Sequence, residues 1–311
     1  MLSDIVLKTL ADEYDIQPTR CQETHGIMIK SNYVVTDDKG DIWFVKYYPL
    51  AFGESDLARL GQIYCLLEQY SVPTCKVREN IKTRKLYMRA CSGFYLVYNF
   101  INADVADSRS VIKITDTLRK LHGISDASFK MILGSTHNRI QFARSVYSKL
   151  PYPQYQLFKT YLGDKVEEIG RLLNMPVWPC NAVIHGDLNL RNILVKGDEI
   201  YFIDLDEIRL GDPIEDLASL IYSLLYRNGV LDFQSSHDIR SLMSHFFYGM
   251  LTPENIDKTE HVLKVNCIVY LMQRADDYVY LIRHKSTRKF MDSLLAILSN
   301  NVVAKLCAHD I

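Results

Sequence analysis

The most informative stretch of the sequence is VIHGDLNLRNILV, residues 183–195, in which polar side chains lie between two strongly apolar ends. Asp187 and Asn192 supply a carboxylate and an amide there, and Asp204 adds a second carboxylate twelve residues after Asn192. Carboxylate and amide oxygens, completed by water and phosphate, are the ligands that hard cations such as Mg²⁺ prefer. The residue types and their spacing therefore predict a divalent-cation site.

Two short strands must position these oxygens. Segments 192–195 and 199–204 alternate like strands and are joined by a tight-turn signal. Their pairing would bring Asp204, at the end of the second strand, close to Asn192, at the start of the first, with Asp187 in the loop that leads in. The alternative is a polar loop with three unrelated side chains, but it does not explain why they fall at the ends of apolar strands.

The composition is that of an ordinary globular protein with a full core. Of the 311 residues, 48% are hydrophobic and 23% are charged, and the formal net charge is −1. The sequence lacks the basic stripe that nucleic-acid binders usually carry. The seven cysteines are widely spaced and include no CxxC, which favours reduced thiols over a disulfide framework or a zinc site.

The beginning of the chain predicts an amphipathic helix and not a secretion signal, because Asp4 and Lys8 lie among apolar residues at helical spacing. No apolar run approaches the ~20 residues that a membrane span needs. These features predict a cytoplasmic protein that has neither nucleic acid nor a membrane as its partner.

Hydrophobic periodicity divides the chain into a β-rich first third and a helical remainder. In the first third, the predicted elements are strands at 31–37, 41–48, 76–81, 85–90 and 93–101 and one helix at 55–70. In the remainder, the predicted elements are helices at 110–122, 137–149, 154–173 and from 213 on, and a β island at 182–204. A boundary near 99–103 thus separates a small β-rich lobe from a larger α-rich lobe.

The motif His-Gly-Asp-x4-Asn at 185–192, followed by Ile-Asp at 203–204, resembles the catalytic and metal-binding loops of kinase-like phosphotransferases. It is most similar to the aminoglycoside phosphotransferase and choline kinase family of small-molecule kinases. The resemblance implies an α+β, two-lobed protein-kinase-like fold. It also implies an N-terminal nucleotide-binding lobe at 1–98, a hinge at 99–102 and a C-terminal catalytic and acceptor-binding lobe at 103–311.

The resemblance assigns roles around the motif. Asp187 would be the catalytic residue that orients the acceptor hydroxyl and takes up its proton, while Asn192 and Asp204 would hold Mg²⁺ against the triphosphate. Asp206 matches a second acid of some relatives and is given a supporting role at the metal. His185 is expected to shape the loop by packing and hydrogen bonding.

The string GDPIEDLASL at 211–220 predicts a helix start. Asp212 is placed as the N-cap, Pro213 at the first helical position, and Glu215 as the partner that completes a capping box. The same string resembles the Asp-Pro-x-x-Asp element of the family, whose last acid, here Asp216, braces the catalytic loop.

The N-terminal lobe would then bind the nucleotide. Lys46 resembles the strand lysine that pairs the α- and β-phosphates, the alternative being a snorkelling edge residue. Among the acids of the following helix, Glu54 lies nearest the place expected for its ion-pair partner, although helix-dipole preference also explains an acid there. The remaining nucleotide-binding candidates are Ser31 and Asn32 beside the phosphates and the backbone of Asn99, Phe100 and Ile101 at the hinge.

Two features favour a small acceptor. Gly186 occupies the position at which protein kinases carry an arginine for the activation-loop phosphate, and only eleven residues separate Asp204 from Asp216. We therefore expect transfer from ATP, or GTP in its place, with Mg²⁺, to a hydroxyl of an aminoglycoside, a choline-like amino alcohol, a sugar or a related metabolite. Asp277 and Tyr280 are candidate acceptor contacts. The alternatives are a nucleotide-binding pseudokinase and an atypical protein kinase.

Overall fold

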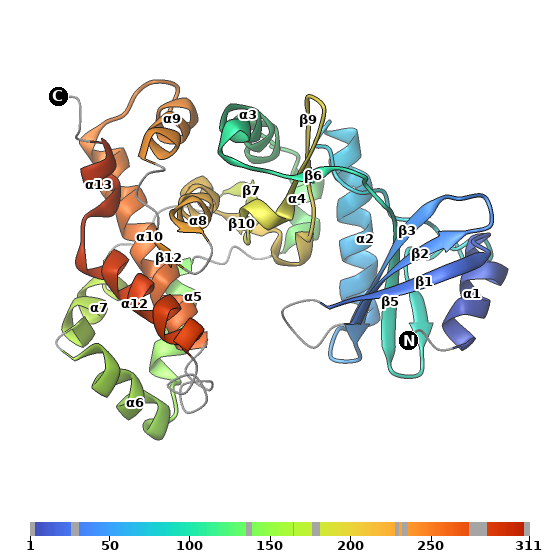
Figure 1. Cartoon of the computed structure of the whole chain (residues 1–311), viewed down its shortest axis with the longest axis horizontal. Coiled ribbons are helices and arrows are strands. Elements are labelled where there is room, and N and C mark those ends of the chain that lie inside the picture. The colour runs from blue at the N-terminus through green and yellow to red at the C-terminus, as the bar shows by residue number, and fades with distance from the viewer. Residues whose placement is uncertain are drawn as a thin grey trace. The chain divides into compact units, whose positions relative to one another are not determined.

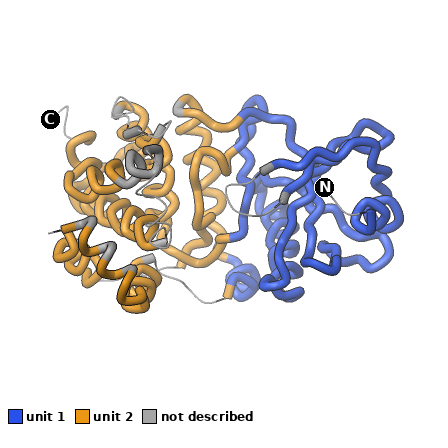
Figure 2. The backbone as a smooth tube through the Cα atoms, turned by 60° about the horizontal axis from the view of Figure 1, so that its bottom comes forward, with its two compact units in different colours: residues 1–104, 126–133, 194–206 blue, residues 105–125, 134–193, 207–311 orange. Residues whose placement is uncertain are grey.

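The computed structural model describes residues 4–25, 31–134, 139–163, 165–175, 181–227, 230–231, 236–273 and 285–307. The chain forms two compact units (Figure 2). The first unit contains residues 1–104, 126–133 and 194–206, and the second contains residues 105–125, 134–193 and 207–311. The first unit thus includes two segments from later in the chain, one of which carries Asp204 and Asp206.

The first unit is built on a five-stranded antiparallel sheet with the order β1–β2–β3–β5–β4 (Figure 1). The strands are β1 (Pro18–His25), β2 (Ser31–Asp37), β3 (Ile42–Pro49), β4 (Met88–Ala90) and β5 (Gly93–Asn99). The strands predicted at 31–37 and 41–48 are confirmed as β2 and β3. The polar strand β1 was not predicted.

Residues 76–81 were predicted to be a strand, and this prediction is wrong. Apart from an isolated bridge between Val77 and Tyr98, the segment follows an irregular path. The Asn80 carboxamide oxygen accepts the N–H groups of Lys82 and Thr83, each at 2.9 Å. Such bonds from asparagine to the backbone two and three residues ahead favour a turn over a strand.

Helix α1 (Asp4–Tyr14) covers one face of the sheet. Its buried Val6 and Leu10 belong to one core cluster with Val45 of β3 and Val97 of β5. The amphipathic pattern at the start of the sequence is thereby explained, because the apolar side of the helix packs on the sheet.

The opposite face carries Lys46 and Tyr48, because successive side chains of a strand point to alternate faces. Helix α2 (Glu54–Gln69) lies on this side. Its Tyr64 ring packs against the Tyr98 ring of β5 in an edge-on arrangement, with 5.1 Å between the ring centroids. The face of the sheet that carries Lys46 is therefore lined by the aromatic side chains of Tyr48, Tyr64 and Tyr98.

The second unit is mainly helical. Its helices are α3 (Val111–His122), α5 (Arg139–Ser148), α6 (Tyr152–Leu162), α7 (Lys165–Leu173), α8 (Pro213–Leu225), α9 (Ser236–Phe246), α10 (Pro253–Gln273), α12 (Lys285–Ser299) and α13 (Val302–Cys307), whereas α4 (Ala127–Leu133) belongs to the first unit. The single helix predicted at 154–173 is instead two helices. They are separated at Gly163, which ends α6 with a φ of +53°.

The β island predicted at 182–204 is confirmed. It consists of β7 (Ala182–Ile184), β8 (Ile193–Lys196) and β9 (Glu199–Phe202), and the remaining short elements are β6 (Asp104–Val105), β10 (Arg209–Gly211), β11 (Tyr226–Arg227), β12 (Val230–Leu231), η1 (Ser108–Ser110), η2 (Leu190–Asn192) and η3 (Leu205–Glu207). Strand β8 pairs with β6 and β9, and β7 pairs with β10. None of the helices in the described ranges is long and apolar enough to cross a membrane.

Candidate active site

Three hydrogen bonds fix the chain around the end of β9 in the first unit. The Phe202 N–H donates to the Pro73 carbonyl at 3.0 Å, and the Thr74 hydroxyl donates to the Phe202 carbonyl at 2.7 Å. Beyond the strand, the Leu205 N–H donates to the Tyr64 hydroxyl at 3.3 Å. The intervening residues are therefore held from both sides by residues of α2 and of the segment after it.

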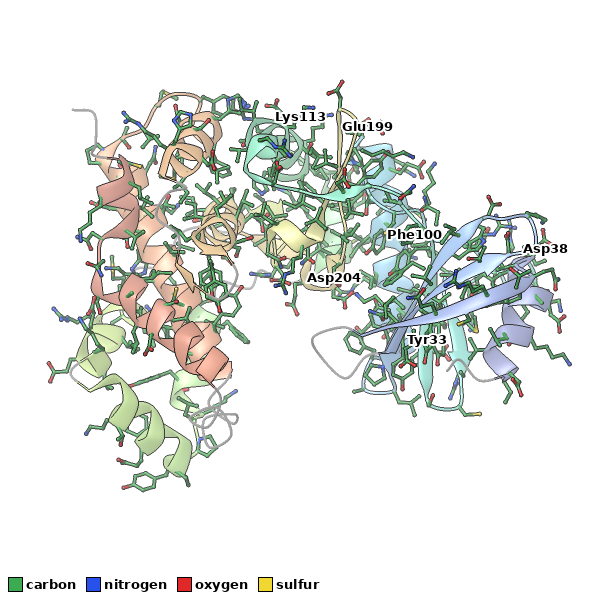
Figure 3. All side chains as sticks on the ribbon, in the orientation of Figure 1. Tyr33, Asp38, Phe100, Lys113, Glu199 and Asp204 are labelled. Carbon is green, nitrogen blue, oxygen red and sulfur yellow. The ribbon has the colours of Figure 1, made fainter. Side chains whose placement is uncertain are left out.

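Asp204, which is labelled in Figure 3, lies between these anchors, and its backbone conformation is strained. Its φ is +61°, in the left-handed region that costs a non-glycine residue about 1–2 kcal/mol. Strain of this kind persists where the surrounding structure imposes it, and it is concentrated at functional sites. The Asp204 side chain is 47% exposed, so its carboxylate can reach a ligand.

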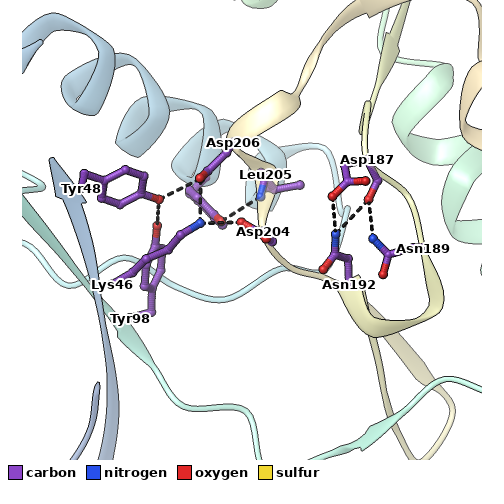
Figure 4. Close-up of polar contacts among 10 residues, drawn as sticks. Lys46, Tyr48, Tyr98, Asp187, Asn189, Asn192, Asp204, Leu205 and Asp206 are labelled. Carbon is purple, nitrogen blue, oxygen red and sulfur yellow. Dashed lines mark hydrogen bonds and ion pairs between the residues drawn. The ribbon is translucent and has the colours of Figure 1, made fainter. Parts of the chain in front are cut away.

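Lys46 of β3 is paired with two carboxylates (Figure 4). Its Nζ donates to Asp204 Oδ1 and, at 2.8 Å, to Asp206 Oδ1, and its side chain is only 9% exposed. Burial is the largest influence on the Lys46 pKa and lowers it, but the carboxylates of Asp206 and Asp204 outweigh burial and raise the pKa above its usual value. The lysine is therefore a cation at neutral pH.

Tyr48 holds Asp206 from a second side. The Tyr48 hydroxyl donates to Asp206 Oδ1 at 2.8 Å and lies 3.4 Å from the Tyr98 hydroxyl. Burial raises the pKa of both phenols well above the usual value, so both stay protonated. Neither tyrosine stands out in the sequence. The signal for Tyr48 is its position two residues after Lys46, which places both on one face of β3.

The expectation that Glu54 is the ion-pair partner of Lys46 is not met. At the start of α2, the Glu54 carboxylate accepts the Tyr87 hydroxyl at 2.8 Å and pairs with Arg89 at 3.1 Å and with Lys85 at 3.5 Å. The Tyr87 hydrogen bond is the largest influence on the Glu54 pKa, which lies below its usual value. The acid is thus held by β4 and the residues just before it.

In the second unit, the loop between β7 and β8 holds Asp187 and Asn192 together. The Asn192 amide nitrogen donates to the Asp187 carbonyl at 2.8 Å and to the Asp187 carboxylate at 3.2 Å. Asn189 accepts the Arg191 N–H at 3.0 Å, and the buried His185 ring accepts the Asp187 N–H at 3.4 Å. The carboxamide oxygen of Asn192 is the atom of this side chain that could bind a hard cation, and the bonds of its NH₂ group to Asp187 fix the side on which that oxygen lies.

The backbone of this loop requires a glycine at position 186. Gly186 has a φ of +84°. A Cβ there would lie 2.0 Å from Arg209 Nη1 and 2.2 Å from the Glu207 carbonyl oxygen, far inside contact distance. Gly186 therefore sets the turn from which Asp187 emerges.

Asp216 of α8 braces the same turn. It is fully buried, and its carboxylate accepts the N–H groups of His185 and Gly186, each at 2.9 Å. His122 Nε2, at the end of α3, lies 3.0 Å from the same carboxylate. Burial is the largest influence on the Asp216 pKa and raises it, but His122 and the loop outweigh burial and leave the pKa below its usual value. His122 was missed because its partner lies far along the chain.

Helix α8 begins where the sequence predicts. Asp212 is its N-cap and accepts the Ile214 N–H at 3.0 Å, with Pro213 at the first helical position. The predicted capping box is not formed, because the Glu215 carboxylate pairs with Arg209 of β10 at 2.7 Å. This buried ion pair connects β10 to the helix that carries Asp216.

Some of the other predicted nucleotide and acceptor contacts lie in the described part of the chain, and others lie outside it. Ser31 begins β2, and the carboxamide oxygen of its neighbour Asn32 is buried without a hydrogen-bond partner in the described chain. Residues 26–30, which precede Ser31, lie outside the described residues. Asp277 and Tyr280 also lie outside them.

At the predicted hinge, two backbone donors are already used within the first unit. The Asn99 N–H donates to the Lys76 carbonyl and the Phe100 N–H donates to the Ile42 carbonyl, both at 3.0 Å. The N–H groups of Asn99 and Phe100 are therefore already engaged in bonds that hold the chain at this point.

Each unit carries functional groups of a kind that phosphoryl transfer uses. The first offers a buried cation, Lys46, beside an exposed carboxylate, and the second offers a carboxylate, Asp187, that an amide orients. The described residues include no cluster of three or more His, Cys, Asp or Glu that could hold a metal ion. A metal ion would instead need amide, phosphate and water oxygens beside a carboxylate, as Mg²⁺ does in nucleotide sites.

Comparisons with known proteins identify the family. The family model described as the phosphotransferase enzyme family (APH) matches residues 26–236, which is more than half of the chain. No curated protein matches the sequence.

Solved structures show the same fold. Spectinomycin phosphotransferase, in complex with ADP and spectinomycin, is 18% identical with a TM-score of 0.66, over 97% of this chain and 99% of that one. An aminoglycoside phosphotransferase from Alicyclobacillus acidocaldarius is 13% identical with a TM-score of 0.69, over 98% and 96%. Choline kinase LicA from Streptococcus pneumoniae is 15% identical with a TM-score of 0.62, over 95% and 98%. The prediction from the motifs is confirmed: the chain has the kinase-like α+β fold and belongs to the phosphotransferase enzyme family.

Proposed function

We propose that the protein is an ATP- and Mg²⁺-dependent kinase that transfers the γ-phosphoryl group to a hydroxyl of a small molecule. The observation that carries this proposal is the pairing of buried Lys46 with the exposed, strained Asp204. A buried cation can pair with the triphosphate, and an exposed carboxylate beside it can bind the metal ion. GTP could serve in place of ATP, since one of the solved relatives, at 14% identity, is a complex with GDP and kanamycin.

The donor chemistry fits Mg²⁺. Asp204 supplies an exposed carboxylate, and Asn192 supplies a carboxamide oxygen whose partner nitrogen is already used by Asp187. These are hard oxygen ligands, and we assign both residues to the metal ion. When bound, Mg²⁺ would neutralise the phosphate oxygens and the charge that develops on them.

Other residues would bind the nucleotide and activate the acceptor. Lys46 pairs with the α- and β-phosphates, and the N–H of Ile101 binds adenine. Asp187 orients the acceptor hydroxyl and takes up its proton, and its carboxylate is itself oriented by Asn192. Positioning and charge neutralisation carry phosphoryl transfer, so no covalent enzyme intermediate is required.

The segment between Asp204 and Asp216 supports a small acceptor over a protein. Its eleven residues are occupied by η3, β10 and the cap of α8. It therefore has no long loop of the kind that protein kinases order by phosphorylation. The solved relatives include a spectinomycin phosphotransferase, a kanamycin complex and a choline kinase. They suggest the first compounds to try, which are aminoglycosides and choline-like amino alcohols, followed by sugars.

The test is ATP consumption over this panel with wild-type protein, Asp187→Asn and the control Asp198→Asn, which changes an exposed acid between β8 and β9. We expect turnover on one acceptor class, its loss in Asp187→Asn with ATP binding kept, and no effect of Asp198→Asn. Equal turnover by Asp187→Asn would remove its assigned role. Metal-dependent stabilisation by ATP without turnover on any acceptor would instead favour a pseudokinase.

A further inference from the structure

The partner of Lys46 differs from that in protein kinases, where a glutamate of the following helix forms the ion pair. In this chain the acid at the start of that helix, Glu54, is bound by Tyr87 and Arg89. The position of the lysine must therefore be set by other groups, and the first unit contains them.

Asp206 has the geometry of a tether. Its Oδ1 accepts two hydrogen bonds of 2.8 Å, from Lys46 Nζ and from the Tyr48 hydroxyl. The Asp206 side chain is 15% exposed, compared with 47% for Asp204. Asp206 Oδ1 already accepts two strong donors in a mostly buried side chain, so this oxygen is poorly placed to bind a metal ion. The exposed carboxylate of Asp204 is well placed to do so.

Tyr48 is itself rigid. Its side chain is fully buried, and Lys46 Nζ lies 5.0 Å from the centre of its ring. Its hydroxyl lies 3.4 Å from that of Tyr98, whose ring packs against Tyr64 of α2. Buried aromatic rings in contact have little freedom to move, so the hydroxyl donor to Asp206 has a fixed position (Figure 4).

We propose that Asp206, oriented by the Tyr48 hydroxyl, is the residue that positions Lys46 for the nucleotide phosphates, and that Asp206 is not a ligand of the metal ion. This rests on the proposed function, and it changes one assignment made from the sequence, in which Asp206 supports the metal. Asp206 and Tyr48 are positioning residues, because they act through the lysine. The metal carboxylate is then Asp204.

The experiment separates nucleotide affinity from metal requirement. The dissociation constant of ATP is measured by calorimetry with a chelator and no divalent ion, and the Mg²⁺ concentration for half-maximal stabilisation by ATP is measured by thermal shift. The variants are Tyr48→Phe, Asp206→Asn and Asp204→Asn. The matched control is Tyr47→Phe, a neighbouring tyrosine whose hydroxyl donates to the Ser92 carbonyl at 2.5 Å.

We expect Tyr48→Phe and Asp206→Asn to weaken metal-free ATP binding about tenfold, as the loss of a hydrogen bond to a charged group would. The Mg²⁺ requirement of both variants should match that of wild-type protein. Tyr47→Phe should match wild-type protein both in metal-free ATP affinity and in Mg²⁺ requirement. Asp204→Asn should raise the Mg²⁺ requirement. If Asp206→Asn raised it as Asp204→Asn does while keeping metal-free affinity, or if Tyr48→Phe behaved as Tyr47→Phe does, the proposal would be overturned.

The outcome is independent of the acceptor. Absence of turnover on every acceptor would contradict the proposed function and leave these binding ratios unchanged. If wild-type protein bound no ATP, the rate at which an amine-acylating reagent labels Lys46, read by mass spectrometry, would still test the tether. Faster labelling in Tyr48→Phe and Asp206→Asn than in Tyr47→Phe would support it, and equal labelling would overturn it.

Discussion

Asp216→Asn should lower the free energy of unfolding by about 2–4 kcal/mol, although it replaces one oxygen by an NH₂ group. The fully buried carboxylate accepts two N–H groups, from His185 and Gly186, at 2.9 Å each, and faces His122 Nε2 at 3.0 Å. An amide keeps one acceptor and turns an NH₂ group toward the donors on the other side. At least one bond to a charged group is then lost, and each is worth about 1.5–3 kcal/mol.

The assay is urea unfolding followed by circular dichroism, with Asp116→Asn as the matched control. Asp116 also faces a histidine, His245 at 3.2 Å, and pairs with Arg119 at 2.8 Å, but its side chain is 56% exposed. Exposed pairs of this kind contribute about 0.2–1 kcal/mol. If Asp216→Asn cost no more than Asp116→Asn, the claim that Asp216 braces the turn at His185 and Gly186 would be refuted.

The same substitution predicts a pH dependence. The pKa of Asp216 in the folded protein lies below its usual value of about 3.9, so its ionised form stabilises the fold at any pH above that value. This stabilisation is lost as the pH falls through the folded-state pKa. The gap in stability between wild-type protein and Asp216→Asn should therefore shrink below about pH 4. A gap that stayed constant from neutral to strongly acidic pH would contradict the assignment.

Three further outcomes are expected. Gly186→Ala should leave the protein folded but lower turnover on its acceptor at least tenfold, about 1.4 kcal/mol, because a Cβ there meets Arg209 at 2.0 Å. Glu54→Gln should change ATP affinity less than about twofold in calorimetry, because an exposed ion pair such as that of Glu54 with Arg89 contributes little. Burial lowers the pKa of His261 to about 4. The free energy of unfolding should therefore fall by up to about 3 kcal/mol as the pH is lowered from about 6.5 to 4. Urea unfolding of His261→Leu should not show this dependence of the unfolding free energy on pH.

The local parts of the site could be predicted from the sequence. The loop that holds Asp187 and Asn192, the N-cap at Asp212 and the β8–β9 hairpin all depend on residues fewer than a dozen positions apart. Each has a signal in residue type and spacing, such as a proline after an aspartate or a glycine in a turn. Local hydrogen bonds and alternation of polarity therefore suffice to place these elements along the chain.

The missed features depend on contacts between distant segments. Strand β1 has the sequence PTRCQETH, which is too polar for an alternating pattern and is a strand because β2 pairs with it along its length. The segment 76–81 was predicted to be a strand, yet the side chain of Asn80 bends it by accepting N–H groups two and three residues ahead. The partners of His122 and Lys46 lie 94 and about 160 residues away, so no spacing rule could identify them.

The sequence Ile-Asp-Leu-Asp also shows why acids of equal chemistry acquire different roles. Burying a carboxylate without a counterion costs several kcal/mol, so a mostly buried acid must be paired and hydrogen-bonded, and Asp206 is both. Asp204, two residues earlier, is pushed into solvent by a left-handed backbone that the anchors at Phe202 and Leu205 hold in place. The exposed acid can therefore exchange water for a ligand, whereas the buried one can only hold its lysine. Burial, which the sequence does not reveal, therefore distinguishes the two acids, and the proposed roles of Asp204 and Asp206 follow from this difference.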